Sequence, residues 1–204
     1  MVGLFALLGI AVIVAALRRG GVGGDAAARR AGALAEARVA RRLRRLGRHL
    51  IVWNDVHVRS GNRTSQIDHV VWTPRGLVLI ETKHWTGRLH VLSPTEWVQY
   101  NGRRRRVMHS PEHQSFYHER VMQEVLQHHG LGKTPLTSII VLTHPASRVY
   151  GETTLPCVRF RQLRRWMRPY QQANATIAMP DPARFALLFA LGTAPKSQAR
   201  GAQK

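Results

Sequence analysis

The segment QIDHVVWTPRGLVLIETKHWTG, residues 66–87, decides the fold of this chain. Two runs rich in Val, Ile and Leu flank the sequence TPRG, which has proline at the second position and glycine at the fourth position of a tight turn. The pattern predicts an antiparallel β-hairpin. Asp68, Glu81 and Lys83 interrupt its apolar runs, and charged side chains are costly to bury unless they are paired or bind a metal ion. The chemistry of the protein therefore depends on how the hairpin accommodates these three charges.

The register of the hairpin decides which of its polar residues meet. Opposed residues of an antiparallel pair have position numbers with a constant sum, and their side chains share one face of the sheet. If residues 74 and 75 form the centre of the turn, the sum is 149, which places Asp68 opposite Glu81. The same sum places Gln66 opposite Lys83. A three-residue loop with a glycine bulge gives a sum of 150 instead, and then Asp68 and Glu81 lie on opposite faces.

The two carboxylates of the hairpin predict a bound cation. When their Cβ atoms lie about 5 Å apart, carboxylates repel each other unless a positive charge lies between them. Oxygen ligands from Asp68 and Glu81 suit Mg²⁺ or Mn²⁺. Lys83 would then lie beside the ion and stabilise negative charge on a phosphate. In the structural alternative, Asp68 caps a strand end and Glu81 forms a salt bridge with Lys83.

Apolar residues occupy both faces of the hairpin, which predicts that protein covers both faces. Periodicity in the rest of the soluble part indicates a helix before the hairpin, and a helix and a strand after it. The predicted elements are a helix at 26–48, strands at 50–60, 66–73 and 77–83, short outer strands within 88–100, a helix at 110–130 and a later strand. This order indicates a mixed α/β sandwich around a central sheet.

The chain is strongly basic: 31 Lys and Arg residues against 11 Asp and Glu residues give a formal net charge of +20. Such an excess predicts a polyanionic partner, either nucleic acid or an anionic membrane surface. The candidate phosphate-binding residues are Arg41, Arg42, Arg44, Arg45, Arg103, Arg104, Arg105 and Arg106. For the first four, lipid headgroups suit the charge as well as DNA does.

The sequence shows no zinc-binding pattern. Its single cysteine, Cys157, excludes a cysteine-rich zinc site and an internal disulfide framework. Histidines between residues 109 and 129 have helical spacing, but no acidic or cysteine partner has a matching position. We therefore expect these histidines to face solvent.

Residues 2–17, VGLFALLGIAVIVAAL, are uncharged and almost wholly apolar. As a helix they would span roughly 24 Å, and the arginines that follow favour a single-pass anchor in the cell membrane, with the soluble domain in the cytoplasm. A signal peptide and a buried core helix are the alternatives. The predicted parts are an anchor at 1–19, a glycine-rich linker at 20–25, a domain at 26–192 and a disordered tail at 193–204.

The ordered set of Glu36, QIDHVV at residues 66–71 and TPRGLVLIETKHWTG at residues 73–87 resembles the NERD family, the nuclease-related domain. That family is similar to the PD-(D/E)xK restriction-endonuclease-like superfamily. The resemblance covers residues 32–127 and implies a restriction-endonuclease-like core of a helix, a three-stranded antiparallel meander, a helix and a further strand. The asparagine that usually follows the lysine of the family's ETK motif is His84 here.

The resemblance also implies roles for individual residues. By this resemblance the metal ligands are Asp68 and Glu81, and the further site residues are Lys83, Glu36, Gln66 and Gln114. Lys83 matches the catalytic lysine, and Glu36, the only acid of its predicted helix, matches the acidic residue of the family's first helix. Gln66 matches a polar residue near the site, and Gln114 is expected to face the site.

The implied activity is Mg²⁺- or Mn²⁺-dependent hydrolysis of a DNA phosphodiester, with the arginines holding the phosphate backbone. Two alternatives remain open: a non-catalytic nucleic-acid-binding module at the membrane, and a basic membrane-surface scaffold that carries a relic of the motif. No feature of the sequence sets the oligomeric state.

Overall fold

The computed structural model describes residues 22–47, 49–171 and 179–192. The chain divides into two compact units, residues 1–34 and residues 35–204. Every strand described here belongs to the second unit, which is described by itself below.

The predicted membrane anchor at residues 2–17 lies outside the described residues, as does the predicted tail at residues 193–204. No helix within the described part of the chain is long and apolar enough to cross a membrane. The first described helix, α2, spans Val22–Arg44. It begins before the predicted start at residue 26, so it includes part of the predicted linker, and the alanine- and arginine-rich sequence that follows favours helix.

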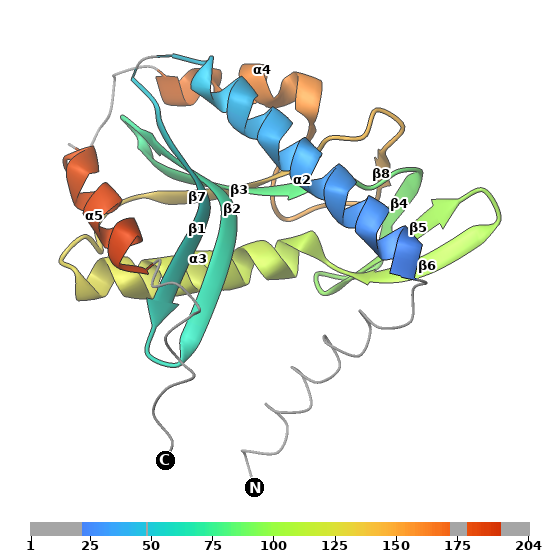
Figure 1. Cartoon of the computed structure of the whole chain (residues 1–204), viewed down its shortest axis with the longest axis horizontal. Helices are drawn as coiled ribbons and strands as arrows, with labels where there is room; N and C mark the ends of the chain where they lie inside the picture. The colour runs from blue at the N-terminus through green and yellow to red at the C-terminus, as the bar shows by residue number, and fades with distance from the viewer. Residues whose placement is uncertain (1–21, 48, 172–178, 193–204) are drawn as a thin grey trace, which may run out of the picture. The chain divides into compact units, whose positions relative to one another are not determined.

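The larger sheet has five strands in the order β1-β2-β3-β7-β9. These strands span, in that order, Ile51–Ser60, Arg63–Thr73, Gly76–Lys83, Leu136–Leu142 and Cys157–Arg159. The first three form an antiparallel meander, and β7 and β9 continue the sheet in parallel (Figure 1). The predicted order of helix, three strands, helix and strand is present, and the fold is mixed α/β.

The smaller sheet has four strands in the order β6-β5-β4-β8. These strands span, in that order, Arg104–His109, Glu96–Asn101, Arg88–Val91 and Arg148–Tyr150. Its core residues Leu89 and Trp97 form a buried cluster with Ile140 and Leu142 of β7. The sequence indicated only outer strands here, because the pairing of β8 with β4 joins segments about sixty residues apart.

The remaining elements are helical. Helix α3 spans Pro111–His128, α4 spans Leu163–Met167 and α5 spans Pro182–Gly192, and the 3₁₀ turns η1 and η2 span Phe160–Gln162 and Arg168–Gln171. Helix α3 begins as predicted, because the side chain of Ser110 accepts a hydrogen bond from the Glu112 N–H at 3.1 Å. A proline at the first helical position supports the same start.

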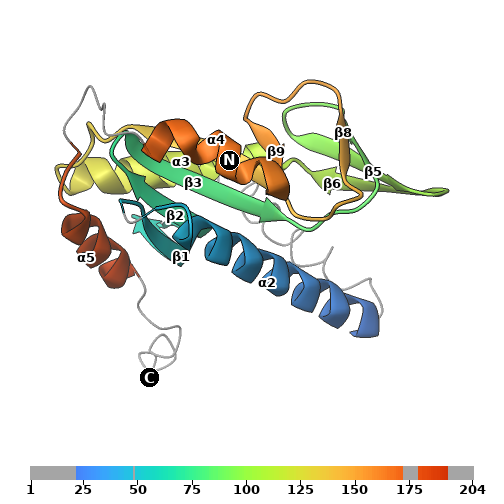
Figure 2. The ribbon, with the colours of Figure 1, turned by 90° about the horizontal axis from the view of Figure 1, so that it is seen from above.

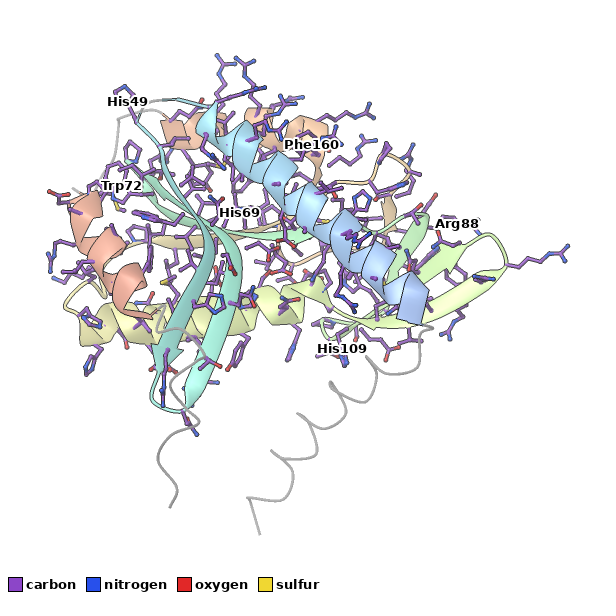
Figure 3. All side chains as sticks on the ribbon, viewed as in Figure 1. His49, His69, Trp72, Arg88, His109 and Phe160 are labelled. Carbon is purple, nitrogen blue, oxygen red and sulfur yellow. The ribbon has the colours of Figure 1, made fainter. Side chains whose placement is uncertain are left out.

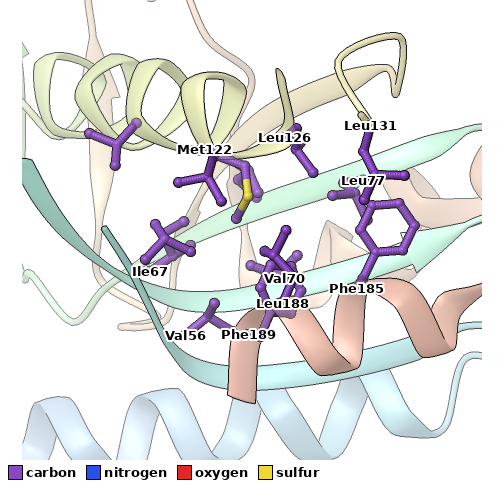
Figure 4. Packing of buried hydrophobic residues seen from close by; sticks show 14 residues of the cluster. Val56, Ile67, Val70, Leu77, Met122, Leu126, Leu131, Phe185, Leu188 and Phe189 are labelled. Carbon is purple, nitrogen blue, oxygen red and sulfur yellow. The ribbon is translucent and has the colours of Figure 1, made fainter. Parts of the chain in front are cut away.

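Both faces of the larger sheet are covered, as predicted. On one face, Ile67 and Val70 of β2 form a buried cluster with Met122 of α3 and Phe185 of α5 (Figure 4). On the other face, Val71 and Ile80 are buried together with side chains of α4 and of the part of α2 that belongs to the second unit. Figure 2 shows α2 and α3 on opposite sides of β3. The hairpin is therefore the central layer of this unit.

The register of the hairpin has the predicted sum of 149, and the alternative sum of 150 is wrong. Trp72 lies opposite Leu77, and Thr73 lies opposite Gly76. Thr73 fixes the two-residue turn, because its Oγ1 donates to the Gly76 carbonyl at 2.7 Å and accepts from the Arg75 N–H at 3.1 Å. Gly76 has a φ of 140°, which side chains rarely adopt, so the turn depends on this glycine.

Replacing Gly76 by alanine is expected to destabilise the protein by roughly 3 kcal/mol. The added Cβ would lie 2.6 Å from the carbonyl oxygen of Pro135, in addition to the backbone strain. Gly61→Ala is the control, since Gly61 also has a positive φ of 58° but open space around it, and it should cost only about 1 kcal/mol. Urea denaturation of the two variants measures the difference. Equal losses would show that the contact with Pro135 does not constrain the turn.

Candidate active site

Two interruptions in the strand pairing define the candidate site. The pairing of β1 with β2 is continuous except at Asp55 and Asp68. Asp55 has a φ of 53°, a left-handed conformation that is uncommon outside glycine but is tolerated by Asp and Asn. The pairing of β2 with β3 ends at His69 and Ile80. The Asp68 carboxylate, beyond that point, accepts a hydrogen bond from the backbone N–H of Thr82 at 2.7 Å.

A series of polar contacts surrounds the second carboxylate. Glu81 is buried, with 3% of its surface exposed, and its Oε1 lies 2.6 Å from Lys83 Nζ. Its Oε2 lies 3.2 Å from His118 Nε2, a contact without hydrogen-bond geometry. His118 Nδ1 lies 2.6 Å from Ser65 Oγ, and Lys83 Nζ donates to Gln114 Oε1 at 2.9 Å. Helix α3 therefore holds both charged residues of β3.

The carboxylates of the site repel one another. Burial, followed by the charge of Glu81, raises the pKa of Asp68 from 3.8 to about 7. Partial desolvation and the charges of Glu81 and Asp55 also raise the pKa of Glu36. Burial acts to raise the pKa of Glu81 too, but its two side-chain contacts hold that pKa below its ordinary value. Four of the 11 acidic residues thus influence one another in a chain of net charge +20.

The structure brings together most of the residues predicted for the site. Lys83 and Gln114 are in contact with each other, and Glu36 lies close enough to Asp68 and Glu81 for their charges to interact. Gln66 is placed differently: its side chain is exposed and donates to Asp55 Oδ1 at 2.6 Å. The predicted position opposite Lys83 is wrong, because the β2–β3 pairing ends before it.

Asp55 and His118 are site residues that sequence reasoning missed. His118 is 6% exposed, so the expectation that the histidines face solvent is wrong for this residue. Its spacing of four residues after Gln114 places both side chains on one face of α3 and was the available signal. For Asp55 the signal was the pair Asn54-Asp55 within a predicted strand, since both residue types are depleted in strands.

This arrangement of side chains suits a divalent cation that is bound by only a few protein ligands. Among the described residues, no group of three or more His, Cys, Asp or Glu side chains is placed to hold a metal ion. Mg²⁺ commonly binds through one or two carboxylates and keeps several waters. Glu81 Oε2 is buried without a hydrogen-bond partner, and burial and negative neighbours raise the pKa of Asp68. A bound cation relieves both of these unfavourable features.

Both features of the structural alternative are also present. Glu81 forms a salt bridge with Lys83, and Asp68 accepts a backbone hydrogen bond where the strand pairing ends. The salt bridge with Lys83, together with the contact from His118, accounts for the lowered pKa of Glu81. The two contacts of the alternative do not explain the raised pKa values of Asp68 and Glu36, which result first from burial and then from the charge of Glu81.

The predicted basic residues lie in two regions of the second unit. Arg41, Arg44 and Arg45 are exposed at the end of α2, and Arg42 is half-buried. Residues 103–106 are all exposed, at a turn and along β6. Within β6 the strand alternation separates this run, so that successive arginines point to opposite faces of the smaller sheet.

A family model described as the nuclease-related domain, NERD, matches residues 31–143 of this chain, which is more than half of its length. The chain belongs to the nuclease-related domain family. The NERD match begins within α2 and ends directly after β7, so it extends beyond the predicted motif region of residues 32–127. It contains all the acidic residues of the candidate site, together with Lys83 and His118. No curated protein matches the chain.

The NERD match leaves out the last part of the described chain. Strands β8 and β9, the helices α4 and α5 and the two 3₁₀ turns all follow residue 143. The candidate site is therefore built entirely from the family region. However, side chains of α5 pack against one face of the larger sheet, and side chains of α4 pack against the other face.

The raised pKa of Asp68 predicts how the stability of the metal-free protein depends on pH. The folded-state pKa of about 7 lies above the ordinary value of 3.8, so the folded state binds the proton more tightly than the unfolded state does. The contribution of Asp68 to the free energy of unfolding is complete below about pH 4 and decreases as the pH rises through 7. We expect Asp68→Asn to remove this decrease, which amounts to roughly 4 kcal/mol at most.

Urea denaturation between pH 4 and pH 8, with EDTA present, measures this dependence. Glu96→Gln, on an exposed residue of the smaller sheet, changes the net charge by the same amount and serves as the control. If Asp68→Asn and the control retain the same pH dependence, Asp68 ionises freely in the folded protein and the repulsion inferred above is absent.

Proposed function

We propose that this NERD protein is a metal-dependent nuclease that hydrolyses phosphodiester bonds of DNA. The observation that carries the proposal is the contact of 2.6 Å between Lys83 Nζ and the buried Glu81, beside Asp68 with its raised pKa. A lysine held beside clustered carboxylates suits the neutralisation of a phosphate, because a substrate phosphate needs both a cation and a positive side chain.

Mg²⁺ or Mn²⁺ is the proposed cofactor, with Asp68 and Glu81 as the residues that would hold it. When bound, the ion would act as a Lewis acid and lower the pKa of a coordinated water. The other roles belong to side chains of this chain. Lys83 would stabilise charge on the phosphate, and its hydrogen bond to Gln114 fixes the direction of its ammonium group. Glu36, whose raised pKa favours proton binding, would accept or return a proton through water.

Gln66 and the arginines have supporting roles in this proposal. The hydrogen bond from Gln66 to Asp55 holds the unpaired part of β1 in place beside Asp68. The exposed arginines of α2 and β6 would contact the phosphate backbone, which gives affinity without sequence preference and a steep dependence on salt.

We also propose that the fold is restriction-endonuclease-like and that the protein is a single-pass membrane protein with its NERD domain in the cytoplasm. The order of helix, meander, helix and parallel strand supports the first proposal. The apolar sequence of residues 2–17, followed by arginines, supports the second. A fusion of residues 1–30 to a reporter that is active only in the cytoplasm tests the orientation.

The nuclease proposal predicts metal-dependent cleavage that requires Lys83. The full chain, in mild detergent, should cut plasmid or single-stranded DNA with Mg²⁺ or Mn²⁺ and lose activity in EDTA. Lys83→Ala and Asp68→Ala should each lower the rate by 100-fold or more, on the order of 3 kcal/mol of transition-state stabilisation. Gel electrophoresis of labelled DNA measures the rate.

Glu96→Ala, on an exposed residue at the start of β5 in the smaller sheet, is the control for loss of one carboxylate. Equal cleavage by wild type and both site variants would indicate a contaminating nuclease and would contradict the proposal. If none of the proteins cuts DNA but all bind it alike, the non-catalytic binding module is the better description. If none binds DNA, the basic membrane-surface scaffold remains.

A further inference from the structure

A hollow of about 410 Å³ lies between the end of α2 and α4, outside the candidate site. Its lining residues are Arg38, Arg41, Arg42, Arg45, Leu46, Phe160 and Arg164. Five of these seven side chains are arginines, and none is acidic. The sequence analysis identified three of the five as candidate phosphate ligands, but Arg38 and Arg164 were not among them. Arg164 reaches the hollow from a helix beyond the family match.

A second hollow, of about 280 Å³, shares Arg38 and Phe160 with the first. Its other lining residues are Leu142, Thr143, His144, Pro145, Arg148, Arg159 and Arg161. The two hollows adjoin at Arg38 and Phe160 and together are lined by eight arginines. We name this pair of adjoining hollows the arginine groove. No acidic side chain lines it.

Phe160 organises the centre of the arginine groove. The guanidinium carbon of Arg38 lies 4.4 Å from the centre of the Phe160 ring, and that of Arg42 lies 5.0 Å from the same centre. Figure 3 shows Phe160 beside α2. Stacking on an aromatic ring holds a guanidinium in place while its N–H groups stay available. Two of the positive charges are therefore positioned before any ligand binds.

The charges of the arginine groove are not balanced by carboxylates. Within the described part of the chain, the arginines that form ion pairs are Arg63 and Arg120, both with Glu124, and neither lines the groove. Crowded like charges destabilise a folded protein unless anions offset them. Arg148 and Arg159 donate hydrogen bonds to neighbouring uncharged groups, but no described carboxylate pairs with any of the eight guanidinium groups. Such a surface is suited to bind a chain of phosphates.

The arginine groove reaches the strand that carries the catalytic lysine. Leu142 lies opposite Lys83 in the pairing of β3 with β7, and the Thr143 N–H donates to the Lys83 carbonyl at 3.0 Å. His84, directly after the lysine, lies 2.8 Å from Thr143 Oγ1 through its Nδ1. One end of the groove therefore lies at the end of β3, next to the candidate site.

The composition of the arginine groove favours nucleic acid over a membrane surface. Protein surfaces that bind lipid combine basic residues with exposed apolar side chains that enter the bilayer. The large apolar residues of this groove are covered instead: Phe160 is 9% exposed, and Leu46 is half-buried. Contacts to the phosphates of a nucleic acid need basic side chains and no such apolar insertion.

We propose that the arginine groove binds the sugar-phosphate backbone of a single DNA strand and guides it to or from the site at Lys83. The proposal rests on the proposed nuclease function for its choice of DNA as ligand. It adds binding residues beyond the NERD match, namely Arg148, Arg159, Arg161 and Arg164. It places one end of the strand path at the end of β3, where Thr143 contacts the backbone of Lys83.

The test compares two double variants that lower the net charge equally. Arg161→Gln with Arg164→Gln removes two exposed charges from the groove. Arg59→Gln with Arg184→Gln removes two exposed charges that do not line it. The full chain in mild detergent, with EDTA to prevent cleavage, is titrated into a fluorescently labelled single-stranded 20-mer, and anisotropy reports binding.

We expect the groove variant to bind at least tenfold more weakly than wild type, and the control variant to stay within about twofold. The slope of log K against log salt should decrease in magnitude by about 1.4 for the groove variant, since each phosphate contact contributes about 0.7 for single strands. Equal losses in the two variants, or no loss in either, would overturn the proposal. Thermal melting of both variants confirms that each is folded.

Two further measurements separate this proposal from its alternatives. If the wild-type protein shows groove-dependent binding of the 20-mer but does not cleave DNA with Mg²⁺ or Mn²⁺, the nuclease function alone is refuted. Vesicles of phosphatidylcholine with phosphatidylserine test the membrane alternative. If the groove variant loses binding to these vesicles but keeps its affinity for the 20-mer, the groove is a lipid-binding surface and the proposal fails.

Discussion

The contact between Glu81 and Lys83 is the interaction on which the rest of the site depends. A carboxylate that is 3% exposed is stable only if nearby groups compensate for its lost hydration. Lys83 does so at 2.6 Å, and His118 lies 3.2 Å from the other oxygen. The lysine is in turn held by Gln114. Removing Lys83 would leave the buried Glu81 without its closest positive partner. Because Gln114 and His118 contact this pair, β3 and α3 are connected through polar groups as well as through packing.

The fold makes this burial possible by covering both faces of the hairpin. Helices α3 and α5 complete one face and α2 and α4 complete the other, so the polar ends of β2 and β3 lie next to a dry core. Burial removes water from the Asp68 carboxyl, and the nearby charge of Glu81 adds to this effect, which is why the pKa of Asp68 rises to about 7. A small acidic region inside a chain of net charge +20 is consistent with the proposal that this site binds a cation and a phosphate together.

The family region and the residues after it make different contributions. The NERD match contains the acidic residues, the lysine and α3, which are the parts to which the proposed chemistry is assigned. The segments after residue 143 supply the aromatic ring and half of the arginines of the groove. Phe160 receives guanidinium groups from α2, across more than a hundred residues of sequence. The residues beyond the match thus extend the positive surface that begins in the family region.

The sequence by itself determined the hairpin and the residues at its polar ends, and it limited the register to two possible sums, between which the structure decided. Thr73 and Gly76 fix a two-residue turn locally, and the resemblance to the NERD family, with its metal-binding and lysine positions, follows from the ETK and QID motifs. The tertiary structure alone decided the rest. His118 is a site residue because α3 returns across the sheet, and Asp55 meets Gln66 because the β1–β2 pairing is interrupted beside Asp68. The arginines of α2 and α4 form one groove only after β9 aligns with β7. Local patterns specify turns and faces, whereas contacts between distant segments depend on how those faces pack, which no single stretch of sequence encodes.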